Sequence, residues 1–204
     1  MPSTLDLARK LLALAQTGLH FTEGEFDKER YHDVARIAEA LLARDVGASS
    51  EQIRAAWQFE AGYATPKVDV RGAVFRDARV LLVRERSDGG WTLPGGWADV
   101  NDSPAEAVEK EILQESGFSA RAAKLAAVYD RNKHAHPWYL FHVWKLFFVC
   151  EITGGSPQSS LETDGVDFFA LDGLPPLSAP RVTAAQIRRM YEHHCDRALP
   201  ADFD

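Results

Sequence analysis

Several features are scarce in this sequence of 204 residues. Cysteine and methionine occur only twice each, and no apolar run reaches the length of about 18 residues that a transmembrane helix needs. The first residues also lack a basic start followed by an apolar stretch. We therefore expect no disulfide framework, no membrane partner, and a cytoplasmic protein in which Cys150 and Cys195 are reduced thiols.

Positive charge is also in short supply. The 23 Lys and Arg residues stand against 30 Asp and Glu residues, so the net charge is −7. A molecule of this charge repels phosphate backbones and anionic surfaces, and we expect no nucleic-acid polymer as partner. An anionic substrate would need a metal cation or a local basic cluster.

The apolar residues are spaced differently in the two parts of the chain. From Leu5 to about Phe59 they recur every three or four positions, which predicts three amphipathic helices. We expect Gly18 to end the first helix and Asp27 to begin the second, and the third should run from about Glu51 to Phe59. This region, residues 1–62, is predicted to be a small helical N-terminal domain.

The remaining residues, 63–204, are predicted to form a second domain of mixed strands and helices. An apolar period of two predicts strands at 68–75 and 79–84, and two further apolar segments, 124–129 and 142–150, are strand candidates. Thr183 and Gln186 have the spacing of a capping box that opens a helix ending near His194. The sequence as a whole therefore predicts an α+β fold with a helical appendage.

One further helix, from Pro104 to about Ser116, is signalled at both ends. Ser103 is placed as its N-cap and Gly117 follows its last turn. Val108 lies on its apolar stripe, together with Ala105 and Ile112.

Two carboxylates, Glu111 and Glu115, fall at the edge of that stripe. They could reach solvent or pair with basic residues. They could also hold a divalent cation, because burying two like charges one turn apart requires a neutralising partner.

The same segment has a characteristic spacing of glycine and acidic residues. It gives Gly96, five residues, Asp102, seven residues, and then Lys110-Glu111-Ile112-Leu113-Gln114-Glu115-Ser116-Gly117-Phe118. This arrangement, with Trp91–Gly95 before it, resembles the Nudix box: Gly, five residues, Glu, seven residues, Arg-Glu-apolar-x-Glu-Glu-x-Gly-apolar. The match is far more specific than a lone glycine-rich triplet. It implies a Nudix α/β/α sandwich with a mixed sheet.

The resemblance also implies roles for individual residues. Glu111 and Glu115 would hold Mg²⁺ or Mn²⁺ with the Gly95 carbonyl as a further ligand, and both would take part in catalysis. The chain departs from the box at three positions: Asp102 for Glu, Lys110 for Arg and Gln114 for Glu. Gln114 can offer only a neutral carbonyl oxygen, a weaker ligand for a hard cation, so the number of metals stays open.

Two other segments extend the resemblance over nearly the whole chain. Residues 15–19 together with 26–31 resemble the helical N-terminal domain of one Nudix subgroup, and Tyr129–Pro137 resembles that subgroup's internal signature. Members of this subgroup are pyrophosphatases that act on nucleoside diphosphates linked to another group, such as ADP-ribose or CDP-choline. They are typically dimers, so we expect a homodimer.

Charged residues outside the box supply further candidates. Glu162 and Asp164, in a polar loop at 158–165, could take a proton from the attacking water, or they could be structural turn residues. A basic cluster could bind the diphosphate or form a solvated loop, and it comprises Arg131, Lys133, His134 and His136. Arg84 is a further candidate for binding substrate.

Three aromatic residues, Trp97, Trp138 and Tyr139, flank the box and the basic cluster. They could stack on a nucleobase or belong to the core. A second function also remains open, in which Gln114 weakens catalysis and the protein is a nucleotide-binding regulatory module.

Overall fold

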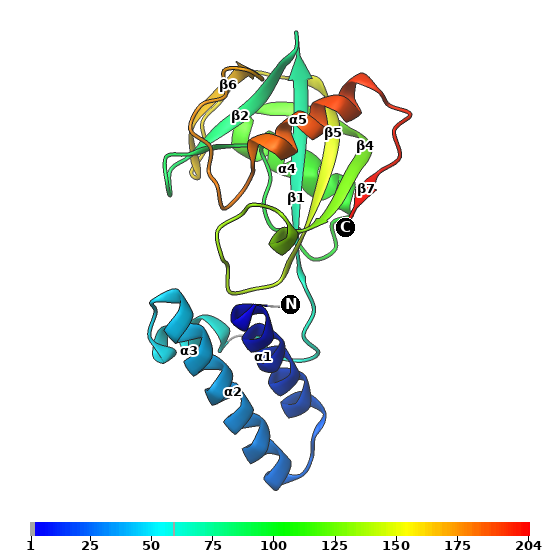
Figure 1. Cartoon of the computed structure of the whole chain (residues 1–204). Coiled ribbons are helices and arrows are strands. Elements are labelled where there is room, and N and C mark those ends of the chain that lie inside the picture. Colours follow the sequence, from blue (N-terminus) through cyan, green and yellow to red (C-terminus); the bar gives the residue numbers. More distant parts are fainter. Residues whose placement is uncertain (1–2, 59) are drawn as a thin grey trace. The chain divides into compact units, whose positions relative to one another are not determined.

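The computed structural model describes residues 3–58 and 60–204, which divide into two compact units (Figure 1). The first unit runs to Pro66 and also contains the distant segment Tyr139–His142. The second comprises Lys67–Trp138 and Val143–Asp204. The predicted domain boundary at residue 62 falls in the linker between the last helix of the first unit and the first strand of the second.

The first unit consists of three helices, α1 (Thr4–Phe21), α2 (Glu25–Val46) and α3 (Ser50–Trp57). Ser3 and Ser49 cap α1 and α3 through reciprocal capping boxes, which satisfy the free N–H groups of the first turns. The buried apolar residues of this unit are Ala8, Leu12, Ala15, Ala38, Leu42, Ile53 and Leu140. The sequence thus predicted the three helices correctly, although Phe59, the expected end of the third, lies outside the described residues.

The segment Tyr139–His142 belongs to this helical unit through specific contacts. Arg9, itself buried, donates from Nε to the Leu140 carbonyl at 2.9 Å and from Nη2 to the Tyr139 carbonyl at 2.7 Å. The Phe141 ring stacks on Trp57 with centroids 5.3 Å apart. Leu140 lies 131 positions after Arg9, so a segment distant in sequence completes the core of the helices.

Two predicted helix boundaries are wrong. Gly18 does not end α1, which continues to Phe21, and a Cβ at Gly18 would lie 2.3 Å from the Tyr31 ring. Glycine is thus needed there for the close approach of α2 rather than for a turn. Asp27 does not begin α2 either, because the helix starts at Glu25 behind Gly24 and Asp27 lies within its first turn.

The second unit is built on a mixed sheet. Its strands are β1 (Lys67–Arg76), β2 (Arg79–Glu85), β3 (Trp91–Thr92), β4 (Phe118–Asp130), β5 (Val143–Gly155), β6 (Thr163–Ala170) and β7 (Asp202–Phe203). The strand order is β3-β2-β1-β5-β4-β7, and β6 pairs with β2. β1 runs parallel to β5 and antiparallel to β2, which it meets only near the tight turn between them.

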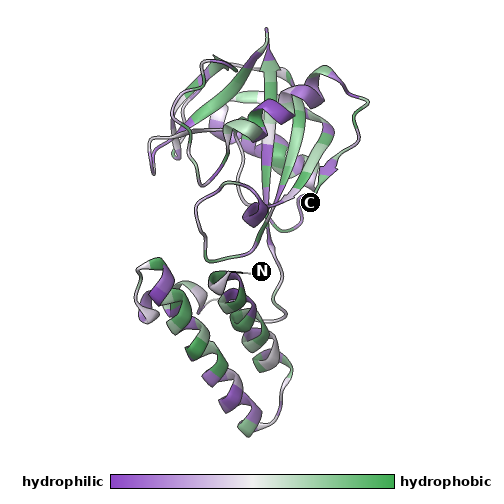
Figure 2. Cartoon of the chain, viewed as in Figure 1, coloured by the Kyte–Doolittle hydropathy of each residue, from purple (hydrophilic) through white to green (hydrophobic). Residues whose placement is uncertain are grey.

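Two helices, α4 (Pro104–Ser116) and α5 (Ala184–Cys195), cover opposite faces of this sheet (Figure 1). On α4, Val108 and Ile112 pack with Val70 and Val74 of β1. On the other face of the sheet, Ile187 and Met190 of α5 pack in one cluster with residues of β1 and β5. The strand residues of this cluster include Ala73, Phe147 and Val149. Figure 2 shows the strands to be mostly hydrophobic. The α/β/α arrangement expected from the sequence is therefore present.

Three strands escaped the sequence analysis, namely the two-residue strands β3 and β7 and the longer β6. The polar segment 158–165 was expected to be a loop throughout, whereas its last residues belong to β6, which begins at Thr163. β6 pairs with β2, and its Thr-Asp-Gly-Val-Asp start lacks the alternation that marks a strand. The predicted start of another strand, Lys124, is also wrong, because β4 begins at Phe118.

None of the described helices is long and apolar enough to cross a membrane. Both cysteines are free thiols, as the sequence predicted, with Cys150 buried and Cys195 exposed. Burial raises the pKa of the Cys150 thiol to about 12, so this group is an inert core residue rather than a nucleophile.

Candidate functional site

The helix α4 carries the two box carboxylates and is held firmly at both ends. Ser103 accepts from the Glu106 backbone N–H and Glu106 closes the capping box. Gly117 ends the helix in the left-handed region with φ 75°. These boundaries are those predicted, and they place Glu111 and Glu115 on the side of the helix that faces the sheet.

Glu115 is the more deeply buried of the two carboxylates, with 5% of its surface exposed. Its Oε2 accepts a hydrogen bond from the Gly95 N–H at 2.8 Å. Its backbone carbonyl accepts from the Thr163 hydroxyl at 2.7 Å, which fastens the end of α4 to β6. Burial raises the pKa of Glu115 to about 8, and nearby Arg71 opposes this shift.

Glu111 lies one turn earlier, against the glycine pair that precedes the box. A Cβ at Gly96 would stand 2.8 Å from Glu111 Oε1, so a larger residue there would displace the end of this side chain. Burial also raises the pKa of Glu111. Both carboxylates are thus held where ionisation is unfavourable unless a cation joins them.

The backbone of the glycine pair offers one more oxygen. Pro94 and Gly96 carbonyls accept hydrogen bonds from the Gly72 and Val70 N–H groups of β1. Among residues 3–58 and 60–204, no donor is bonded to the Gly95 carbonyl or to Glu115 Oε1. Two carboxylates and a carbonyl are the kind of oxygen ligands that a hard divalent cation prefers.

No group of three or more His, Cys, Asp or Glu side chains placed to hold a metal occurs in the described part of the chain. Gln114, the predicted fourth ligand, is exposed on α4 between Glu111 and Glu115. The cation would thus be held by fewer charged side chains than the full box provides. Lys110 binds Asp99 at 2.6 Å and Asp102 at 3.1 Å. Lys110 and Asp102, which both differ from the usual box residues, therefore pair with each other.

Three buried charged residues beside the box were not identified from the sequence. Asp69, Arg71 and Lys145 are each less than 5% exposed and lie on adjacent strands β1 and β5. Arg71 binds both carboxylate oxygens of Asp69, and Lys145 donates to the same carboxylate. The only sign of them in the sequence was the presence of charged residues within the mostly apolar strands β1 and β5.

These ion pairs decide the charge states of the cluster. Burial alone would raise the pKa of Asp69, but Arg71 and Lys145 outweigh it and lower that pKa. Burial lowers the pKa of Lys145 to about 8, against the pull of Asp69. Arg71 also donates to the Leu93 carbonyl at 3.1 Å, so it supports the strand that leads to Gly95.

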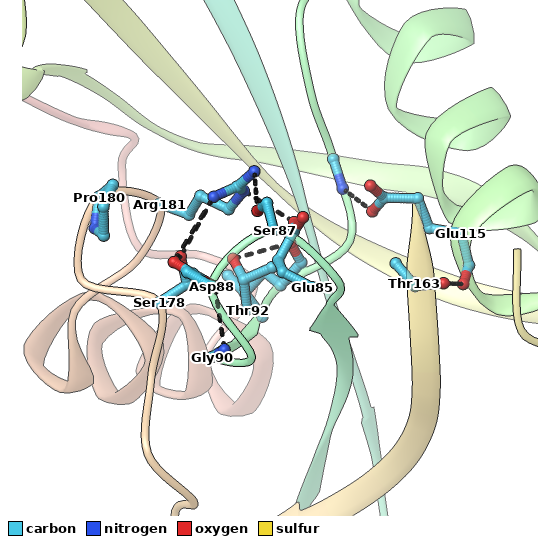
Figure 3. A network of polar contacts seen from close by, with 12 residues as sticks. Glu85, Ser87, Asp88, Gly90, Thr92, Glu115, Thr163, Ser178, Pro180 and Arg181 are labelled. Atoms are coloured by element: carbon cyan, nitrogen blue, oxygen red, sulfur yellow. Dashed lines mark hydrogen bonds and ion pairs between the residues drawn. The ribbon is translucent and has the colours of Figure 1, made fainter. Parts of the chain in front are cut away.

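A second polar network contains the buried carboxylate of Glu85 (Figure 3). Glu85, which is 4% exposed, pairs with Arg181 Nε at 2.7 Å. Arg181 also approaches Asp88, whose carboxylate accepts from the Ser178 hydroxyl at 2.8 Å. The network joins the loop after β2 to the loop before α5, and no sequence motif marks it.

The predicted basic cluster occupies the turn after β4, including a short 3₁₀ helix, η1 (Arg131–Lys133). Arg131 is buried and donates to the Pro180 carbonyl at 3.3 Å, while Lys133 is exposed. His134 approaches Asp204 at 3.2 Å. Burial lowers the pKa of His136 to about 4, so the expectation that this residue adds positive charge at neutral pH is wrong.

The contacts of His136 also fix its tautomer. Nδ1 lies 2.8 Å from the Ala179 carbonyl and must donate to it, and Nε2 then accepts from the Gln186 side-chain amide at 3.1 Å. Gln186 belongs to the capping box of α5. His136 therefore fastens the turn to the start of α5.

The two candidate bases differ in their surroundings. Glu162 is exposed in the loop before β6, and its charge is among those that raise the pKa of Glu111 and of Glu85. Asp164 lies in β6 and accepts from Arg84 Nε at 2.6 Å. Glu162 thus stands within electrostatic range of the box, whereas Asp164 and Arg84 pair with each other.

The aromatic candidates are divided between the two units. Trp97 and Trp138 belong to the second unit and are 47% and 36% exposed. Tyr139 belongs to the helical unit. The two tryptophans are thus accessible and not core residues.

Comparison with known families gives two matches. Residues 2–57 match a domain described as UDP-X-like, N-terminal oligomerisation domain. Residues 65–193 match the NUDIX domain.

Individual relatives agree with these matches. The Bacillus subtilis protein YjhB is 43% identical over 188 residues, which cover 92% of this chain and 90% of that protein. An ADP-ribose pyrophosphatase structure from Streptococcus suis is 39% identical, with a TM-score of 0.64, and the match covers 69% of this chain and 100% of that one. The structure of a UDP-X diphosphatase is 33% identical with a TM-score of 0.65, and 98% of each chain is covered.

Proposed function

Because the chain belongs to the Nudix family and is a Nudix hydrolase, we propose that it is a metal-dependent pyrophosphatase acting on a nucleoside diphosphate linked to a second moiety, X. The substrate is of the ADP-ribose or CDP-choline type, and the products are a nucleoside monophosphate and phospho-X. Relatives named ADP-ribose pyrophosphatase and UDP-X diphosphatase support this substrate class.

The observation that carries the proposal is the buried carboxylate of Glu115, which has one oxygen bonded to the Gly95 N–H and the other without a donor in the described part of the chain. A carboxylate so placed needs a cation to be stable in its charged form. When bound, Mg²⁺ or Mn²⁺ would neutralise the diphosphate and acidify a bound water. Glu111, Glu115 and the Gly95 carbonyl would hold the cation.

Other residues of this chain would accept the proton of the attacking water and bind the phosphates of the substrate. Glu162 takes the proton of the attacking water, because its carboxylate is exposed and close enough to influence Glu111. Arg84 and Lys133 present exposed cations to the diphosphate, and Arg131 and His134 shape the turn that carries Lys133.

Product analysis tests the substrate class. The full chain is incubated with ADP-ribose, CDP-choline and UDP-sugars in the presence of Mg²⁺ or Mn²⁺, and the products are separated by chromatography. We expect a nucleoside monophosphate and phospho-X from at least one of these compounds. Binding of a nucleotide without turnover of any of them would favour the alternative, a nucleotide-binding regulatory module weakened by Gln114.

Changing Gln114 to Glu should tighten cation binding. The position lies exposed between the two box carboxylates, and a hard cation prefers a charged oxygen to an amide oxygen. We expect the Mg²⁺ concentration for half-maximal rate to fall several-fold. An unchanged titration curve with unchanged kinetics would show that residue 114 does not face the cation.

Stability should depend on pH and on metal through Glu115. Its pKa of about 8 in the folded chain exceeds that of an exposed glutamate, so the folded state binds the extra proton between these values. Raising the pH from 5 to 8 without metal should therefore lower the free energy of unfolding, because the folded chain must give up this proton. Thermal melting should show that Mn²⁺ restores stability at pH 8 more than at pH 5, and the reverse order would contradict the assignment.

We infer a cytoplasmic homodimer in which the helical unit forms the contact. The match to an oligomerisation domain supports this, as do the exposed apolar residues of that unit: Leu7, Leu14, Phe21, Phe26, Ile37 and Tyr63. The two free thiols suit the reducing cytoplasm.

Deleting residues 1–62 should disrupt both association and folding. The deletion removes the partners of Leu140 and Phe141, which would then be exposed. We expect aggregation or a changed oligomeric state in sedimentation velocity. A deletion product that keeps the association state and activity of the full chain would contradict the inference.

A further inference from the structure

We propose that Asp69 locks Arg71 in a fixed orientation and so keeps this buried cation from pairing with Glu115, which stays available to a divalent cation. Asp69 would thus be a positioning residue of the site, which acts by holding Arg71 away from Glu115. The inference rests on the proposed function, because it concerns the same metal-binding carboxylate.

The lock consists of hydrogen bonds that all three guanidinium nitrogens of Arg71 donate. Arg71 Nε donates to Asp69 Oδ2 at 3.1 Å, and Nη2 donates to Asp69 Oδ1 at 2.7 Å. Nη1 donates to the Leu93 carbonyl at 3.1 Å. A planar guanidinium held by a bidentate carboxylate and a carbonyl cannot rotate without breaking these bonds.

The lock is itself fixed by the sheet. β1 and β5 run parallel with Asp69 in register with Lys145, whose ammonium donates to Asp69 Oδ2. Asp69, Arg71 and Lys145 are each less than 5% exposed, so water cannot replace these contacts. Asp69 is therefore held from two sides by cations.

Glu115 is the competing anion. It is 5% exposed, and Arg71 is the positive charge that acts on it most strongly. Within the described residues, no hydrogen bond or ion pair joins the two side chains. A direct pair would be strong at such low solvent exposure, and it would occupy the oxygen that a metal needs.

Direct binding of Mn²⁺, measured by electron paramagnetic resonance without substrate, tests the lock. Asp69→Asn keeps the size of the side chain but releases Arg71, and we expect Mn²⁺ affinity to fall about tenfold, which is about 1.4 kcal/mol. The double variant Asp69→Asn/Arg71→Met removes the released cation as well. It should bind Mn²⁺ within about threefold of the wild type.

A matched control releases another locked arginine. Asp202 binds Arg189 through Nε at 2.6 Å and Nη2 at 2.7 Å, on the edge strand β7 at the far side of the sheet from β3. Asp202→Asn should leave Mn²⁺ affinity unchanged. Thermal melting of each variant reports whether it folds.

The outcomes separate the lock from the proposed function. Failure of the wild type to bind Mn²⁺ would overturn the proposed function, and the lock with it. If the wild type binds, then an Asp69→Asn affinity within twofold of it, or a double variant no better than Asp69→Asn, overturns the lock alone. Should Asp69→Asn not fold, Arg71→Met carries the test: it should bind Mn²⁺ at least as tightly as the wild type, and weaker binding overturns the inference.

Discussion

Glu115→Gln should lower kcat at least about 100-fold, or about 2.7 kcal/mol of transition-state stabilisation, while the fold stays intact. The amide keeps the size of the side chain, and its oxygen can still accept from the Gly95 N–H. The substitution removes the negative charge that residue 115 can offer to a cation. The stabilisation by Mn²⁺ in thermal melting should therefore disappear together with the activity.

Glu106→Gln is the matched control for this loss. Glu106 lies on the same helix and accepts from the Ser103 N–H in the capping box, a role that glutamine also fills. Its kcat should stay within about twofold of the wild type. Near-normal turnover of a folded Glu115→Gln variant would remove Glu115 from the mechanism.

Glu162→Gln should lower kcat about 100-fold, the range typical of a lost general base. The side chain is exposed, so neither stability nor Mn²⁺ affinity should change by much. Loss of kcat with unchanged metal binding distinguishes a proton acceptor from a metal ligand. Steady-state kinetics and Mn²⁺ titration of the same preparation measure both quantities.

Asp164→Asn is the control for Glu162→Gln, because Asp164 lies two residues further on and its carboxylate is bound by Arg84. Its kcat should fall by less than about threefold. If Asp164→Asn loses activity and Glu162→Gln does not, the proton acceptor is Asp164 and the present assignment is wrong.

The sequence predicted the parts of the site that have local signals. Ser103, Pro104 and Gly117 mark the ends of α4 through backbone chemistry that depends only on neighbours in the chain. The spacing of Glu111 and Glu115 placed them at the edge of the buried face, and the structure buries Glu115 and leaves Glu111 partly exposed. The capping residues and the helical periodicity were thus enough to predict where these two carboxylates lie on α4.

The sequence did not predict the features that depend on contacts between distant strands. Asp69 and Lys145 are 76 positions apart and meet only because β1 and β5 pair in parallel. Glu85 and Arg181 similarly join the end of β2 to the loop before α5, and no motif connects them. His136 was taken as a cation because its burial against α5 could not be seen in the sequence.

The dependence of turnover on a divalent cation tests the central claim most directly. The full chain is freed of metal with a chelator, passed into metal-free buffer, and assayed with its best nucleoside diphosphate–X substrate while Mg²⁺ or Mn²⁺ is added back. We predict no nucleoside monophosphate without the cation and full recovery when it is restored, with the Glu115→Gln variant inactive throughout. Turnover that persists in excess chelator would contradict the account.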